Sequence, residues 1–107
     1  AYANVQTLNG QLRPGDSTLP DGKYYDEYSF NFTAGQRVRI DLDSPDFDTY
    51  LYLYSPSGRL EENDDRGGGN FNSTIETTAT ESGVYRVRAS TYLAGHTGDY
   101  TVIVSTP

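Results

Sequence analysis

Apolar and polar residues alternate along most of this chain, with the period of two that is typical of β-strands. Val38, Ile40 and Leu42, for example, fall on one face of such a segment. No stretch shows the period of about 3.6 residues that marks an amphipathic helix. The pattern predicts eight strands, over residues 5–12, 26–32, 37–43, 49–54, 60–63, 74–79, 84–91 and 99–105.

Turn-forming residues separate these segments. Examples are "AGQ" at 34–36, "SPSG" at 55–58 and "ESG" at 81–83, where Gly and Pro supply the backbone angles that tight turns need. Many short strands at this spacing predict an all-β fold, an antiparallel β-sandwich formed by one domain of 107 residues. The residues predicted to face its core are Tyr28, Phe30, Phe32, Val38, Ile40, Leu42, Tyr85, Val87, Ala89, Tyr100, Val102 and Val104.

The segment "TYLYLY" at 49–54 raises a question about its second face. If Leu51 and Leu53 point into the core, Tyr50, Tyr52 and Tyr54 form an aromatic row on the opposite face. One interpretation is that a neighbouring segment covers this row. The other is that the row binds a ligand, with flat rings that stack on a sugar or a polypeptide and hydroxyls that form hydrogen bonds.

Charge and composition narrow the class of partner. The formal net charge is −7, which disfavours nucleic acid and anionic membrane surfaces. There is no cysteine and no apolar run near the roughly 20 residues that span a bilayer. The first residues, "AYANVQ", are typical of the small-residue start left after signal-peptide removal. We therefore expect a secreted protein that is not inserted in a membrane.

Five oxygen-bearing side chains in two acidic segments are candidate metal ligands. Calcium takes six to eight oxygen ligands, and glycines at 67–69 allow backbone carbonyls to turn inward. The alternative is that the acids cap turns through hydrogen bonds to their own backbone. The spacing matches no EF-hand, so both interpretations stay open, with calcium the one candidate cofactor. The candidate ligands are Asp46, Asp48, Asn63, Asp64 and Asp65.

Catalytic residues are not indicated. His96, the single histidine, lies in the glycine-flanked segment "AGHTGD", and a lone histidine in a turn is usually just solvated. Without a cysteine there is also no thiolate nucleophile. We therefore expect that this chain is not an enzyme.

The N-terminal segment "AYANVQTL" carries no charge. An uncharged extended segment can add to an open sheet edge, in its own domain or in a neighbouring copy. Pairing between copies that does not close on itself produces a filament. Residues 1–7 are therefore a possible extension or exchanged strand.

Several motifs together resemble the bacterial pre-peptidase C-terminal domain. They are "LNGQL", "YYDEYSFNFTAGQRVRIDL", "FDTYLYLYSPSGRLEENDD", "NSTIETTATESGVYRVRAS" and "GDYTVIV", which span about Leu8 to Val104. The resemblance implies a jelly-roll sandwich and a non-catalytic appendage of exported proteins. The related collagen-binding domains of clostridial collagenases hold their substrate with a tyrosine-bearing sheet face and bind calcium.

One departure concerns that calcium site. In the collagen-binding relatives it draws carboxylates from an acidic segment before the first strand, whereas residues 1–15 here contain no Asp or Glu. We therefore do not expect that particular site. The function expected is extracellular binding or adhesion to a polymer, a protein or a cell surface. The alternative is a structural subunit that assembles into an extracellular filament through its N-terminal strand.

Overall fold

The computed structural model describes residues 3–63 and 72–107, and every regular element in those ranges is a β-strand. The predicted strands agree with the observed ones to within one residue at each end. No helix in the described part of the chain is long and apolar enough to cross a membrane. The strands are β1 (Asn4–Leu12), β2 (Asp26–Phe32), β3 (Arg37–Asp43), β4 (Thr49–Tyr54), β5 (Leu60–Asn63), β6 (Ser73–Thr78), β7 (Gly83–Thr91) and β8 (Gly98–Thr106).

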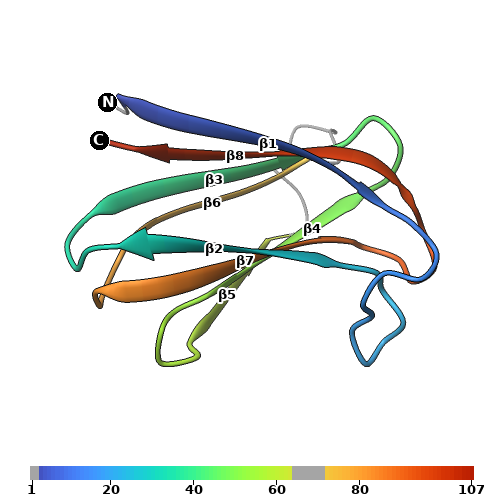
Figure 1. Cartoon of the computed structure of the whole chain (residues 1–107), viewed down its shortest axis with the longest axis horizontal. Helices are drawn as coiled ribbons and strands as arrows, with labels where there is room; N and C mark the ends of the chain where they lie inside the picture. Colours follow the sequence, from blue (N-terminus) through green and yellow to red (C-terminus); the bar gives the residue numbers. More distant parts are fainter. Residues whose placement is uncertain (1–2, 64–71) are drawn as a thin grey trace.

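The strands form two four-stranded antiparallel sheets that pack face to face (Figure 1). One, which we call the β1 sheet, has the order β1-β8-β3-β6, and the other, the β4 sheet, has the order β2-β7-β4-β5. Apart from the β4–β5 hairpin, consecutive strands lie in different sheets, as in a jelly roll, so the predicted all-β sandwich is confirmed. The two ends of the chain lie close together at one end of the sandwich (Figure 1).

The core lies between the sheets and follows the alternation seen in the sequence. Ile40, Leu42, Val87, Ala89 and Val102 are completely buried. The other predicted core residues are also buried, or pack against the core from a half-buried position in the case of Tyr28 and Phe30. The period of two therefore assigned the inward faces correctly, because a strand in a sandwich can bury only alternate residues on one side.

Polar contacts join the two sheets where apolar packing ends. The hydroxyl of Tyr100 on β8 donates to Asp26 Oδ2 on β2 at 2.6 Å, and it is also hydrogen-bonded to the hydroxyl of Tyr28. Burial raises the pKa of Tyr100, and the hydrogen bond to Asp26 raises it further. The phenol therefore stays protonated and remains a donor across the sandwich.

Gly10 on β1 makes room for this contact. A Cβ built at residue 10 would collide with the hydroxyl and ring of Tyr100 and with the hydroxyl of Tyr28. We predict that Gly10→Ala destabilises the fold by about 1–3 kcal/mol, the usual cost of overpacking, when unfolding is followed in urea. Gln11→Ala, a change at the exposed neighbouring position, is the control and should alter stability little. Equal stability of the two variants would contradict this account of Gly10.

Candidate functional site

The tyrosine row lies on the outer face of the β4 sheet. β4 is an interior strand between β7 and β5, and Leu51 and Leu53 point into the core with exposed fractions of 0% and 3%. Tyr50 and Tyr54 are half-buried on the opposite face, whereas Tyr52 between them is only 6% exposed. Tyr50 and Tyr54 therefore expose part of their rings to solvent, and Tyr52 lies mostly covered between them.

Two further tyrosines and a lysine extend this row. The rings of Tyr50 and Tyr52 are 4.8 Å apart between centroids, and the ring of Tyr92, just after β7, stacks on Tyr50 at 6.3 Å. Lys23 Nζ lies 4.3 Å from the centroid of the Tyr50 ring. Tyr25 joins the group through Arg88. We call the surface formed by Tyr25, Tyr50, Tyr52, Tyr54 and Tyr92 the tyrosine face.

Arg88 on β7 covers the other end of the row. It pairs with Tyr52 in the sheet register, and its guanidinium lies 4.8 Å from the Tyr54 ring and 4.5 Å from the Tyr25 ring. Its Nε donates to Glu27 Oε1 at 2.9 Å. Burial on its own would lower the pKa of Arg88, but the hydrogen bond to Glu27 and the adjacent tyrosines raise it overall. Arg88 is therefore a fixed cation over the rings.

The loop between β1 and β2 carries Lys23 to the tyrosine face. A bridge joins Thr18 to Tyr24, and the backbone N–H of Leu19 donates to the carbonyl of Lys23 at 2.8 Å. The buried hydroxyl of Ser90 donates to the carbonyl of Tyr24 at 2.7 Å, which fastens the loop to β7. The side chain of Lys23 is only 14% exposed as a result. Its ammonium is held over the rings rather than free in solvent.

These contacts decide what chemistry the surface can do. Burial raises the pKa of Tyr52, with a further rise from the nearby charge of Asp21, so its hydroxyl stays neutral. Lys23 also pairs with Asp21 at 3.4 Å. The face thus presents aromatic rings, phenol hydroxyl groups and paired cations. Such groups can stack on flat surfaces and form hydrogen bonds.

The alternation predicted the row itself but not its neighbours. Lys23 and Tyr25 belong to an irregular stretch, and Tyr92 follows the end of a strand, so none of them falls on a repeating pattern. The alternation along β7 places Arg88 on the outer face of the sheet. Its position beside Tyr52, however, depends on the pairing of two strands that are far apart in sequence. Only the strand order reveals that contact.

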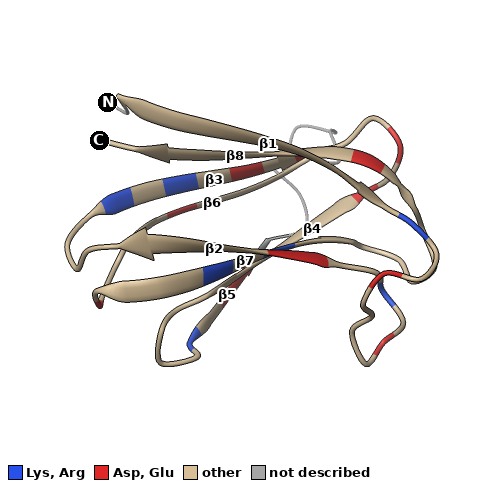
Figure 2. Ribbon diagram, in the orientation of Figure 1, with Lys and Arg blue, Asp and Glu red and all other residues tan. Residues whose placement is uncertain are grey.

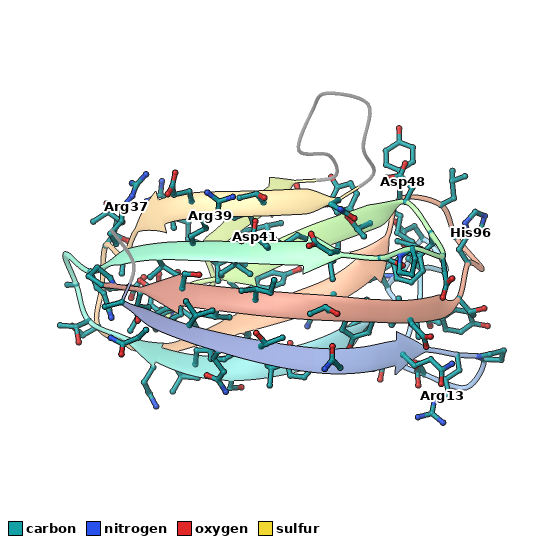
Figure 3. The ribbon with its side chains drawn as sticks, turned by 90° about the horizontal axis from the view of Figure 1, so that it is seen from above. Arg13, Arg37, Arg39, Asp41, Asp48 and His96 are labelled. Atoms are coloured by element: carbon teal, nitrogen blue, oxygen red, sulfur yellow. The ribbon has the colours of Figure 1, made fainter. Side chains whose placement is uncertain are left out.

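The acidic residues proposed for calcium are only partly within the described structure. Asp46 Oδ2 accepts the backbone N–H of Asp99 at 2.8 Å, which ties its turn to the start of β8. Asp48 is half-buried just before β4, at the end of the sandwich that also carries His96 (Figure 3). Asn63 is the last residue of β5, opposite Leu51. Asp64 and Asp65 lie outside the described residues. Within residues 3–63 and 72–107, no three His, Cys, Asp or Glu side chains form a group that could hold a metal.

His96 lies in the loop between β7 and β8 (Figure 3). Its side chain is exposed, in line with a solvated turn histidine. Asp48 is at the same end of the molecule (Figure 3).

Comparisons with known proteins place these features in a family. A search of solved structures finds the periplasmic inhibitor of g-type lysozyme, PliG, of Aeromonas hydrophila, with a TM-score of 0.71 at 16% identity over 96% of this chain and 86% of that one. The pre-peptidase C-terminal domain of a Bacillus anthracis collagenase matches with a TM-score of 0.64 at 17% identity, over 92% and 87%. PliG of Salmonella Typhimurium also matches, with a TM-score of 0.64 at 19% identity, over 97% and 88%. At these identities the likeness shows the fold alone.

The sequence itself gives the family. No curated protein matches the chain. The family model described as the bacterial pre-peptidase C-terminal domain matches residues 24–91, well over half of the sequence. This match includes β2 to β7 and most of the tyrosine face. The chain belongs to the bacterial pre-peptidase C-terminal domain family.

Proposed function

We propose that the chain is a non-catalytic, extracytoplasmic binding module that holds an extracellular polymer or protein surface with its tyrosine face. One observation carries this proposal. Five tyrosines gather on one side of a single sheet, together with Lys23, Arg86 and Arg88. The chain has only eight Lys and Arg and a net charge of −7, and three of these eight basic side chains lie beside the rings.

The composition of this surface is typical of binding hot spots. Tyr and Arg are enriched where protein interfaces gain most of their free energy, because both combine a large planar area with hydrogen-bonding groups. A tyrosine ring also loses few rotamers on binding. Tyr50, Tyr52 and Tyr54 lie on strand β4, and Asp21 and Glu27 hold Lys23 and Arg88 in place. A ligand therefore meets side chains that are already ordered, which lowers the entropy cost of binding.

Two kinds of similar solved structure suggest which partners to test first. The PliG proteins are named as periplasmic inhibitors of g-type lysozyme, and the Bacillus anthracis domain belongs to a collagenase. Both names point to modules that work outside the cytoplasm on a large partner. Fibrous collagen and g-type lysozyme are therefore suitable probes for the tyrosine face.

Tyr54→Ala tests the tyrosine face directly. It removes a half-buried ring that lies beside Arg86 and Arg88. We predict at least about tenfold weaker retention on the probe that the wild type binds, with a loss of stability of about 1 kcal/mol. Retention is measured by co-sedimentation with collagen fibres or by capture on immobilised lysozyme. Thermal unfolding reports on stability.

Val84→Ala is the matched control. Val84 is 48% exposed on β7 and belongs to the same sheet as the tyrosine face, but it takes part in none of the ring–ring and cation–ring contacts described above. Its truncation should leave retention unchanged. Loss of retention in both variants, full retention in Tyr54→Ala, or failure of the wild type to bind either probe would each count against the proposed binding face.

Calcium stays a separate proposal. A site built from the 46–48 and 63–65 segments predicts a higher melting temperature in excess calcium than in chelator, because a ligand that binds only the folded state stabilises it by about 2.7 kcal/mol at 100 times its Kd. Asp48→Asn together with Asp64→Asn should remove this increase. An unchanged melting temperature for the wild type would retire the site, whereas Tyr54→Ala should keep the calcium response.

A further inference from the structure

The four edge strands of the sandwich differ in how they are protected. A sheet edge exposes unpaired backbone N–H and C=O groups, and charged side chains commonly keep other chains from pairing with them. Three edges carry acidic residues: β2 has Asp26 and Glu27, β5 has Glu61 and Glu62, and β6 has Glu76. Among the edge strands of the described part of the chain, β1 alone has no charged residue, and Figure 2 shows it as an unbroken tan ribbon.

β1 also lacks the other devices that block an edge. It is nine residues long, contains no proline, and pairs with β8 in one unbroken register from Asn4 opposite Thr106 to Leu12 opposite Gly98. No bulge turns its outer side away. Val5 is 61% exposed, and Gln6 and Thr7 are also exposed. The outer edge of β1 is therefore a long, regular and neutral template for another strand.

The sandwich is more open on the β1 side than on the opposite side. Opposite, β5 and β6 lie close together, and Thr77 donates a hydrogen bond to Glu61 at 3.2 Å between the sheets. Between β1 and β2 a groove is lined by Val5, Gln6, Phe30, Phe32, Gln36 and Val104. A strand added to β1 would cover this groove and remove part of the half-buried Phe30 from water.

We propose that two copies of this chain associate through β1, paired antiparallel to its counterpart about a two-fold axis. We assign a second copy as the partner because β1 of that copy is itself a long, regular strand without charge, which can pair with the neutral edge of β1. In any register of β1 on β1, no charged residue of one strand faces a charged residue of the other, so the strand pairing itself adds no like-charge repulsion to that between two chains of net charge −7. Like strands in this arrangement form a closed, isologous dimer.

A filament that extends the β1 sheet from copy to copy would pair two less similar edge strands. It requires β1 of one copy to pair with β6 of the next, and β6 is six residues long and carries Glu76, which is paired with Arg37 at 3.5 Å. The N-terminal strand proposed from the sequence as a filament contact lies on its own domain, paired with β8. Its remaining free edge favours a dimer over an open chain.

Thr7→Lys tests the interface. Thr7 is exposed in the middle of β1, opposite Ile103 of its own sheet. The change moves the net charge from −7 to −6, which should favour association in general. In the register that pairs the two nine-residue strands along their full length, however, it places two lysines near each other across the two-fold axis. We predict a dimer in sedimentation velocity between about 10 μM and 1 mM, and a Kd raised at least about tenfold by Thr7→Lys.

Two further variants sharpen the result. Thr78→Lys makes the same change on β6, the opposite edge of the β1 sheet, and should leave the dimer intact. A mixture of Thr7→Lys and Thr7→Glu should restore dimers that neither variant forms well alone, because opposite charges then meet. A wild-type monomer at 1 mM, species that grow beyond a dimer, or weakening by Thr78→Lys but not by Thr7→Lys would each overturn the proposal.

Discussion

The need to cover strand β4 on both faces shapes the β4 sheet. β4 is an interior strand of uncharged residues, with its leucines in the core and its tyrosines on the outer side. A row of aliphatic residues there would expose apolar area with no compensation, whereas tyrosine can bury its ring and keep its hydroxyl in contact with water. The protein completes the cover with Lys23 and Arg88, whose ammonium and guanidinium groups lie over the rings.

These cations keep the cover of the rings ordered, but their contacts with the rings are weak enough for a ligand to replace some of them. A cation over an exposed aromatic ring contributes about 0.5–1 kcal/mol, so a ligand that stacks at the margin of the face displaces little. Asp21 and Glu27 hold Lys23 and Arg88 in position. The interpretation that the row is covered and the interpretation that it binds a ligand are therefore compatible, because the cover is thin and leaves Tyr50 and Tyr54 half-exposed.

The sequence predicted what is local and periodic. Alternation located the strands and the inward leucines of β4, since every position in a strand is fixed relative to its neighbours. It could not pair Arg88 with Tyr52, because strand order depends on contacts distant in sequence. It also could not place Asp46, which the spacing grouped with other acids and the fold joins to the N–H of Asp99. The jelly-roll topology was predicted from the resemblance of several motifs to one family.

The two surfaces proposed here lie on different sheets, and this has a geometric consequence. Antiparallel neighbours in one continuous sheet are related by a two-fold axis perpendicular to that sheet, so pairing of β1 with β1 keeps both β4 sheets on the same side. Both tyrosine faces then point in the same direction. A polymer that reaches from one copy to the other would meet two sites at once, and the second contact would form at a high effective concentration. A weak individual face is sufficient in such an arrangement, which fits a surface made of half-buried rings rather than a deep pocket.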